Sequence, residues 1–440
     1  MEGTDSIQAN RWKTPFFTIW AGQAVSLMGS GIARFALIWW LTEETGSATV
    51  LATTTFFALL PQIVLGPIAG ALVDRWSRRR VMIVADAAIA LVSLWLAWLF
   101  WSGSIAIWHV YLIMLARELG GIFHWPAMQA STSLMVPKEH LARVSGVNQA
   151  MYGALSIVGP AAGALLLTIA PMHSIMFMDV VTASLAITPL LFVAIPQPLR
   201  AAGPDGAKPS MIAELREGMR YLFGWRGLVI IVAAAMLFKI ALTPAFSLLP
   251  LLVKDHFGRG AGELAGLEMA VGVGTILGGL LLGVWGGFKR RIATTMLGLT
   301  LIGLLMLVLG ALPPAFFPVA LAVMLVMGVS IALTDGPLFA VLQGSIAPEI
   351  QGRVFMLFGS LVTLTSPIGL LIAGPVTDVV GIQVWYVVAG LLCLLAGIAA
   401  FFMPSVMNIE QHQAATSAAG EPAGDPALGS PLAQPEPTAR

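Results

Sequence analysis

The stretch from Gly66 to Arg80, GPIAGALVDRWSRRR, joins two apolar segments of membrane-spanning length through a very short basic loop. The first segment ends at Asp74, four arginines follow within six residues, and the next apolar run begins at Val81. Because Lys and Arg concentrate in the cytoplasmic loops of membrane proteins, this loop predicts which side is inside. Gly66 and Gly70 share a helix face, where small residues let a neighbouring helix approach closely. The stretch therefore indicates a multi-pass membrane protein.

The composition supports this class. Of the 440 residues, 58% are hydrophobic and 10% are charged, whereas a soluble protein has roughly 25% charged residues. The net charge of +1 gives no reason to expect nucleic acid as a partner. The single cysteine, Cys393, excludes an intramolecular disulfide. Because there is no Walker loop, no HExxH and no metal spacing among the histidines, we expect no enzyme, no cofactor and no metal.

Hydropathy predicts an all-α membrane protein of twelve transmembrane helices in two six-helix bundles. Placing the N-terminus inside leaves most Lys and Arg residues on the inner side and only Lys254 and Arg259 outside, so both termini are expected in the cytoplasm. The predicted spans are 15–41, 48–73, 81–101, 106–132, 143–170, 172–194, 226–253, 261–286, 292–312, 314–341, 352–379 and 382–404.

A polar break at 195–225, which contains a short amphipathic helix, separates the halves. Weak repeats support two halves. PKEHLARV and PEIQGRV each precede the fifth span of a half, and Gly279-x-x-x-Gly283 echoes the opening glycines. The expected organisation is a cytoplasmic N-terminus (1–14), a first bundle (15–194), a linker (195–225), a second bundle (226–404) and a disordered cytoplasmic tail (405–440).

Ionisable residues inside apolar spans are the candidates for function, because a charge at the bilayer centre costs about 2.5–3.5 kcal/mol. The alternative is structural pairing between neighbouring helices, which we expect for Asp86. The two interpretations stay open for four residues: Arg34, Lys239, Glu118 and Asp335. We favour function for three others: Arg117, Asp179 and Glu268.

Three motifs together resemble those of the major facilitator superfamily (MFS). The loop residues Gly70, Asp74, Arg75, Arg78 and Arg79 resemble the signature between the second and third helices. Arg117-x-x-x-Gly121 resembles the motif whose arginine is implicated in proton coupling. In the fifth span, the residues that resemble the antiporter motif are Gly146, Gly159, Pro160 and Gly163.

Longer segments resemble the macrolide-efflux (Mef) branch, among them FFTIWAGQAVSLMGS (16–30), LTEETGSATVL (41–51), FHWPA (123–127) and GRVFMLFGSLVTLTSPIGLLIAG (352–374). The resemblance implies macrolide export driven by inward proton flow. Glu268 and Asp179 are then the candidates for carrying the proton, and Arg117 for setting its affinity. The fold would place six residues at a central cavity, namely Arg34, Glu118, His124, Trp125, Lys239 and Asp335. Asp74 and Arg75 would act at the cytoplasmic gate, near Arg353.

The expected location is the inner membrane of a bacterium. Candidate partners are the macrolide, protons, the lipid bilayer and an ATP-hydrolysing resistance protein, and we expect a monomer. Two alternatives are open. One is an MFS exporter of another amphipathic compound, such as a siderophore or an unrelated drug. The other is a transport-inactive scaffold or sensor, which would not need charges that converge on a cavity.

Overall fold

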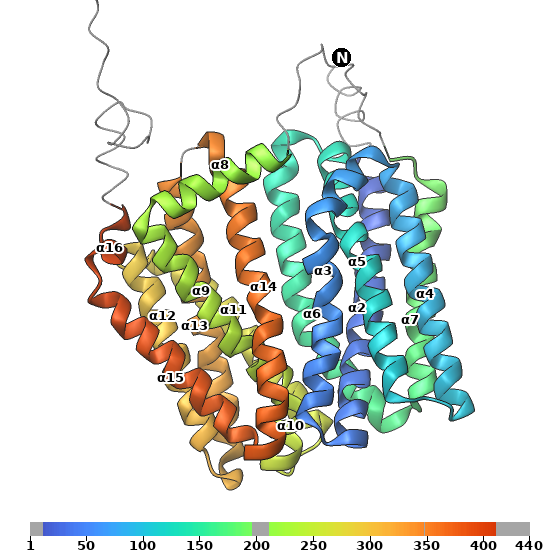
Figure 1. Cartoon of the computed structure of the whole chain (residues 1–440). Coiled ribbons are helices and arrows are strands. Elements are labelled where there is room, and N and C mark those ends of the chain that lie inside the picture. The colour runs from blue at the N-terminus through green and yellow to red at the C-terminus, as the bar shows by residue number, and fades with distance from the viewer. Residues whose placement is uncertain (1–11, 196–210, 347, 411–440) are drawn as a thin grey trace, which may run out of the picture.

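The computed structural model describes residues 12–195, 211–346 and 348–410. The surroundings of Gly70 and the side chains of Asp74 and Arg75 lie outside the described part, so the predictions made for these residues are not addressed by the structure. The described chain is almost entirely helical, and its long helices stand side by side in two groups (Figure 1).

The first group, which we call the N-terminal half, contains the helices that precede the linker. They are α2 (Lys13–Thr45), α3 (Ala48–Arg75), α4 (Arg78–Ser102), α5 (Ile107–Met135), α6 (Leu141–Ile169) and α7 (Met172–Phe192), with the 3-10 turn η1 (Lys138–His140) before α6. The turn between α2 and α3 has a defined cap on each side. Gly46, at φ 57°, ends α2 in the left-handed region, and the Ser47 hydroxyl then accepts a hydrogen bond from Val50 N to start α3.

The C-terminal half follows α8 (Met211–Gly224), which lies across one end of the molecule (Figure 1). Its elements are α9 (Arg226–Ser247), α10 (Leu249–Leu251), the π-helix η2 (Leu252–His256), α11 (Ala261–Trp285), α12 (Arg291–Ala311), η3 (Pro314–Phe316), α13 (Phe317–Ser345), α14 (Pro348–Val380), α15 (Ile382–Phe401) and α16 (Pro404–Met407). We call the end that carries α8 the α8 end. The opposite end, where α10 and the α2–α3 turn lie, is the far end.

Eleven helices in the described residues are long and apolar enough to cross a membrane. They correspond to eleven of the twelve predicted spans. The predicted span 106–132 forms helix α5, which is as long as the others but less hydrophobic than the eleven. Its charged pair Arg117 and Glu118, together with His109 and His124, lowers its hydropathy, and the pattern fits a helix that is partly shielded from lipid by its neighbours.

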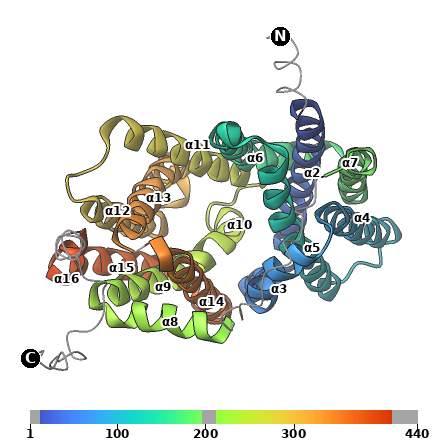
Figure 2. The same ribbon diagram turned by 90° about the horizontal axis from the view of Figure 1, so that it is seen from above.

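The two halves repeat one packing scheme. In the N-terminal half, α3 packs on α5 and α4 on α7, and the equivalent pairs in the C-terminal half are α11 on α13 and α12 on α15. The halves contact one another along α3–α14 and α6–α11. In each of these contacts the second long helix of one half packs on the fifth long helix of the other half. Viewed from the α8 end, the two groups face each other across these contacts (Figure 2). The weak sequence repeat therefore corresponds to a structural one.

Glycines allow the closest helix contacts, although not at the positions expected. A Cβ at Gly279 or Gly283 would meet nothing within 4 Å, so the glycine echo in the second half does not mark a packing site. The close approach of α11 to α13 occurs at Gly274 and Gly328 instead. A Cβ at Gly328 would collide with the backbone of Val271, and only glycine fits such a crossing.

The start of the expected disordered tail packs on the C-terminal half. Val406 and Ile409 are buried, and the Glu410 carboxylate accepts a hydrogen bond of 2.9 Å from Ile292 N. This carboxylate caps the first turn of α12, where the helix dipole is positive. The described chain ends at this residue, and the rest of the tail lies outside the described residues.

Candidate functional site

A cavity of about 940 Å³ lies between the two halves. Helices α2, α3, α5 and α6 line one side, and α9, α10 and α11 line the other. The predicted residues found in its lining are Arg34, Glu118, Lys239, Glu268, Gly159 and Pro160. The volume lies near the top of the range of roughly 300–1,000 Å³ that is usual for small-molecule sites.

Two carboxylates of the cavity wall belong to different halves. Glu118 projects from α5 and Glu268 from α11, and the Arg34 guanidinium on α2 acts electrostatically on both. Lys239, on α9, acts in the same way on Asp335 of α13, a residue that is not part of the lining. The cavity therefore holds two acidic and two basic side chains, and one arginine is shared between the halves. A cationic ligand or a proton could replace this arginine at either carboxylate.

The rest of the wall combines apolar side chains with uncharged polar ones, most of which carry a hydroxyl. The larger apolar groups are Phe35, Ile38, Met114, Phe246 and Ile276. The uncharged polar groups are Thr54, Thr55, Gln62, Ser156, Thr243, Ser247 and Thr275. The sequence analysis did not identify these polar residues. Gln62 gave the clearest signal, since an amide in an apolar span needs a polar partner or water.

The antiporter-like glycines bring α6 close to α2. A Cβ at Gly163 would lie 2.8 Å from a ring carbon of Phe35, and one at Gly159 would lie 3.9 Å from the backbone of Gly31. Gly146, in contrast, has open space around it. Pro160 lies within α6 and lines the cavity beside Gly159. These small residues let the Phe35 ring pack against α6 at the cavity wall.

Arg117 and Asp179, which were each predicted for function, form an ion pair inside the N-terminal half, away from the cavity lining. Arg117 Nη1 is 2.5 Å from Asp179 Oδ2, and the carboxylate side chain is fully buried. Ser30 donates to Oδ1 at 2.9 Å and Ser93 to Oδ2 at 2.6 Å. The network ties α2, α4, α5 and α7 together, and it satisfies a carboxylate that would be costly to bury alone.

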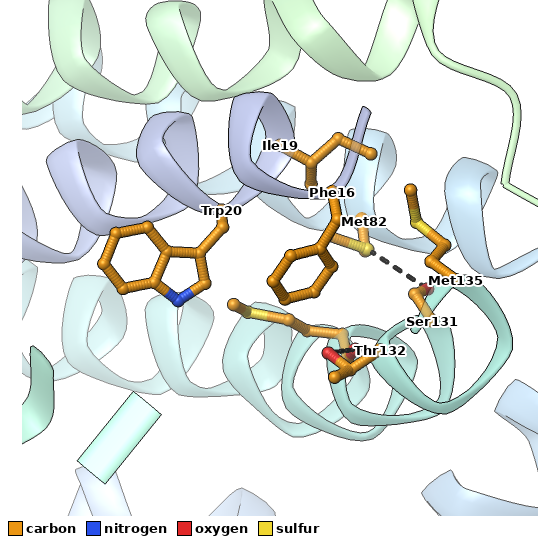
Figure 3. A pocket seen from close by; sticks show the side chains of 8 residues that line it. Phe16, Ile19, Trp20, Met82, Ser131, Thr132 and Met135 are labelled. Carbon is orange, nitrogen blue, oxygen red and sulfur yellow. Dashed lines mark hydrogen bonds between the residues drawn. The ribbon is translucent and has the colours of Figure 1, made fainter. Parts of the chain in front are cut away.

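His124, predicted for the cavity, belongs to a second buried polar cluster in the same half. Its Nε2 lies 3.3 Å from Asp86 Oδ1, while Gln23 donates to Asp86 Oδ2 at 2.9 Å. Asp86 thus has the structural partners expected of it. One turn nearer the α8 end, a pocket of only about 10 Å³ opens beside Met82 and Ser131, which are joined by a weak 3.8 Å hydrogen bond (Figure 3). It is large enough for about one water molecule.

The remaining predicted residues lie elsewhere. The Trp125 ring is 45% exposed and meets the Tyr152 ring edge-on, with 5.2 Å between centroids, outside the cavity lining. Arg78 is buried at the start of α4. Arg79 donates to the carbonyls of Leu190 and Leu191, at the C-terminus of α7.

Arg353 lies in the second turn of α14 and is half-buried. Among the described residues, no group of three His, Cys, Asp or Glu side chains could hold a metal ion.

Residues 19–370 match the sequence model of the Major Facilitator Superfamily. Macrolide efflux protein A of Streptococcus pyogenes is 35% identical over 389 residues, which cover 88% of this chain and 96% of that protein. Macrolide efflux protein A of Enterococcus faecalis is 34% identical over 325 residues, 74% of this chain and 100% of the relative. Multidrug efflux pump Tap of Mycolicibacterium fortuitum is 27% identical over 418 residues, 91% of this chain and 98% of the relative.

Solved structures share the fold at low sequence identity. A point mutant of the nucleoside transporter NupG superposes with a TM-score of 0.71 at 11% identity, covering 88% of this chain and 98% of that one. A bacterial homologue of the human lysosomal transporter Spinster, in an inward-facing and unoccupied conformation, gives 0.67 at 11% identity, covering 92% and 98%. The chain belongs to the Major Facilitator Superfamily, in the branch of the macrolide-efflux proteins.

Proposed function

We propose that this protein exports macrolide antibiotics across the plasma membrane of a bacterium in exchange for protons. The observation that carries the proposal is the 940 Å³ cavity between the halves, whose wall combines apolar and hydroxyl-bearing side chains with two carboxylates. Macrolides combine a large apolar ring with a protonated amino sugar, and such a ligand needs apolar area and an acidic group for its amine. The similarity to macrolide efflux protein A supports this substrate class.

Glu268 is the residue we propose for exchanging proton and drug. It lines the cavity from the C-terminal half, within the electrostatic range of Arg34. A proton and a cationic amine both neutralise the carboxylate, so they compete for it. Competition of this kind makes each ligand drive out the other, and it couples inward proton flow to outward drug movement. Glu118, next to Arg117 on α5, is the corresponding carboxylate of the N-terminal half.

For Arg117 and Asp179 we propose an indirect part in this coupling. Their buried pair fixes the orientation of α5 against α4 and α7, and therefore the position of Glu118 in the cavity. Arg117 also acts electrostatically on Glu118. We propose that the α8 end faces the cytoplasm. The described basic residues at that end support this orientation: Lys13, Arg78, Arg79, Arg80, Lys138, Arg143, Arg216, Arg220, Lys289, Arg290, Arg291 and Arg353.

We propose that a single chain carries out transport, since helices of one chain line both sides of the cavity. An ATP-hydrolysing resistance protein stays a candidate partner, because the sequence has no Walker loop of its own.

Drug susceptibility in a pump-deficient bacterial host tests the function. Expression of the chain should raise resistance to macrolides with fourteen and fifteen ring atoms, and a protonophore should abolish the efflux. Glu268→Gln should abolish resistance at an unchanged level in the membrane, whereas Glu44→Gln, an exposed carboxylate outside the cavity, should not. Full macrolide resistance in the Glu268→Gln variant would reject the role of this residue.

A second candidate is an exporter of several unrelated cationic drugs, favoured by the similarity to multidrug efflux pump Tap. The shared arginine and the hydroxyl-rich wall do not by themselves select a macrolide. The same host, challenged with unrelated cationic drugs and with siderophores, separates the candidates. Resistance limited to macrolides supports the first, and resistance to a wide set of cations supports the second.

A further inference from the structure

Two charged side chains of the C-terminal half hold the α2–α3 turn of the N-terminal half, at the far end of the molecule. Lys254, in the π-helix η2, donates hydrogen bonds from Nζ to the carbonyls of Thr42 at 2.7 Å and Glu43 at 3.1 Å. Asp378, near the end of α14, accepts hydrogen bonds from Ala48 N at 2.6 Å and Thr49 N at 3.0 Å. The Ser47 hydroxyl also donates to Asp378, at 3.0 Å.

Each charge matches the helix terminus that it touches. The last carbonyls of α2 form the negative end of that helix dipole, and they bind the ammonium group of Lys254. The first N–H groups of α3 form a positive end, and they bind the carboxylate of Asp378. The N-terminal half therefore presents two opposite partial charges within one turn of chain, and the other half supplies a complementary ion to each.

The backbone is built for close approach at this point. A Cβ at Gly374 would lie 2.9 Å from Thr49 Cα and 3.1 Å from Ala52 Cβ, so glycine lets α14 reach the start of α3. Deeper by two turns of α3, the hydroxyls of Thr55 and Ser247 are 2.6 Å apart across the same junction. The lining of the cavity begins between these two levels, at Leu51.

We propose that Lys254 and Asp378 are the latch that keeps the cavity closed at the far end, and that both must release before the cavity opens there. The proposal rests on the proposed transport function for the need to open, and on the distances above for the latch itself. Asp378 is exposed and Lys254 is half-exposed. On release, both ions regain water and neither is left buried and unpaired, so the latch can open and close repeatedly.

If the latch exists, it controls from which side of the membrane a reagent can enter the cavity. The test starts from a cysteine-free chain, made by Cys393→Ala, that carries Leu59→Cys in the cavity wall. The rate of labelling by a membrane-impermeant maleimide is measured in whole cells and in inverted membrane vesicles. A second chain carries Ser104→Cys, an exposed position between α4 and α5, and shows which preparation presents the far end.

The double variant Lys254→Met, Asp378→Ala should label at Leu59→Cys about tenfold faster from the far end, and more slowly from the α8 end. A tenfold change corresponds to about 1.4 kcal/mol, which is the size of effect that the loss of one helix cap produces. Lys254→Arg, which keeps the charge, should stay near the parent rate. Asp255→Asn removes an exposed neighbouring charge that is not one of the two latch ions, and it should leave the rate unchanged.

A double variant that purifies with the parent's thermal stability and labels at the parent's rate would overturn the latch. An equal increase in Asp255→Asn would also overturn it, because the effect would then be a general one of surface charge. If the double variant does not fold, Asp378→Asn keeps the side-chain shape and gives the same test on a smaller scale. The readout needs no transport, so a latch that behaves as expected in a chain without efflux would reject only the proposed function. Labelling of Ser104→Cys in inverted vesicles would reject only the orientation.

Discussion

Arg117 and Glu118 are neighbours in α5, yet they belong to different environments. The Arg117 guanidinium bonds Asp179 at 2.5 Å inside the N-terminal half, while Glu118 lines the cavity between the halves. Successive residues on a helix point about 100° apart, so one can turn inward and the next can face the cavity. The neighbours Arg117 and Glu118 therefore connect the buried ion pair of Arg117 and Asp179 to the wall of the cavity.

The first prediction concerns the contribution of the ion pair between Arg117 and Asp179 to stability. Arg117→Met should lower the free energy of unfolding by about 3–5 kcal/mol, because it leaves the fully buried Asp179 carboxylate without its counter-ion. The double variant Arg117→Met, Asp179→Leu should recover most of that loss, since neither charge then remains. Thermal unfolding of the purified protein in detergent measures both values.

Efflux separates the structural role of this pair from a direct part in proton coupling. If the double variant is stable but exports no macrolide, the charges are needed for transport as well as for packing. If the double variant loses as much stability as Arg117→Met and Asp179→Leu lose together, the two residues are not a coupled pair.

The second prediction concerns the crossing of α11 and α13. Gly328→Ala should destabilise the C-terminal half by about 1–3 kcal/mol, because its Cβ would collide with the backbone of Val271 and lie 2.7 Å from Thr275 N. Gly279→Ala, on the partner helix α11 but facing open space, should stabilise it by about 0.5–1 kcal/mol. Melting temperatures of the two variants provide the comparison, and a fall of equal size in both would contradict the assigned crossing.

The helices could be predicted from sequence because a long apolar run directly indicates a segment in lipid. The basic loops in turn indicate which side of the membrane each end of a helix faces. The same reasoning found Glu268, Arg34, Lys239 and Glu118, since a charge in an apolar run is rare and needs a polar environment. It could not tell which of the buried charges face the cavity. Asp179 and Glu268 look alike in sequence, but one is enclosed by Arg117 and two serines and the other lines the hollow.

The missing information is the rotation of each helix and the pairing between halves. The glycine repeat at Gly279 and Gly283 suggested a packing face, whereas the close contact lies at Gly274, where the helix presents a different side. Asp378 gave no sequence signal as a cross-half contact, because two of its three partners are backbone N–H groups some 330 residues away. A hydrogen bond donated by a backbone N–H leaves no trace in the residue type on the donating side.

The third prediction tests the cap that Arg79 forms on α7. Arg79→Met should destabilise the N-terminal half by about 1–2 kcal/mol, because the carbonyls of Leu190 and Leu191 lose a cation at the negative end of the helix. Arg80→Met removes an equal charge from an exposed position in the same first turn of α4 and should change stability little. Comparing the two variants also separates helix capping from an effect on membrane orientation. If membrane insertion fails equally in both variants, these arginines act through their charge alone.

The fourth prediction tests whether the volume of the cavity limits the substrate. Thr275→Trp should lower macrolide resistance sharply, because the indole would occupy part of the 940 Å³ between α11 and the N-terminal half. Leu277→Trp, two residues along the same helix, is 46% exposed and outside the lining, and it should keep the parent's resistance. Minimum inhibitory concentrations of a fourteen-membered macrolide and of a small cationic drug, measured at matched membrane levels, supply the readout. A space-filling effect reduces export of the larger compound more than that of the smaller one. An equal loss for both compounds would instead mean that the indole blocks the movement of the halves, and equal resistance in both variants would place the substrate elsewhere.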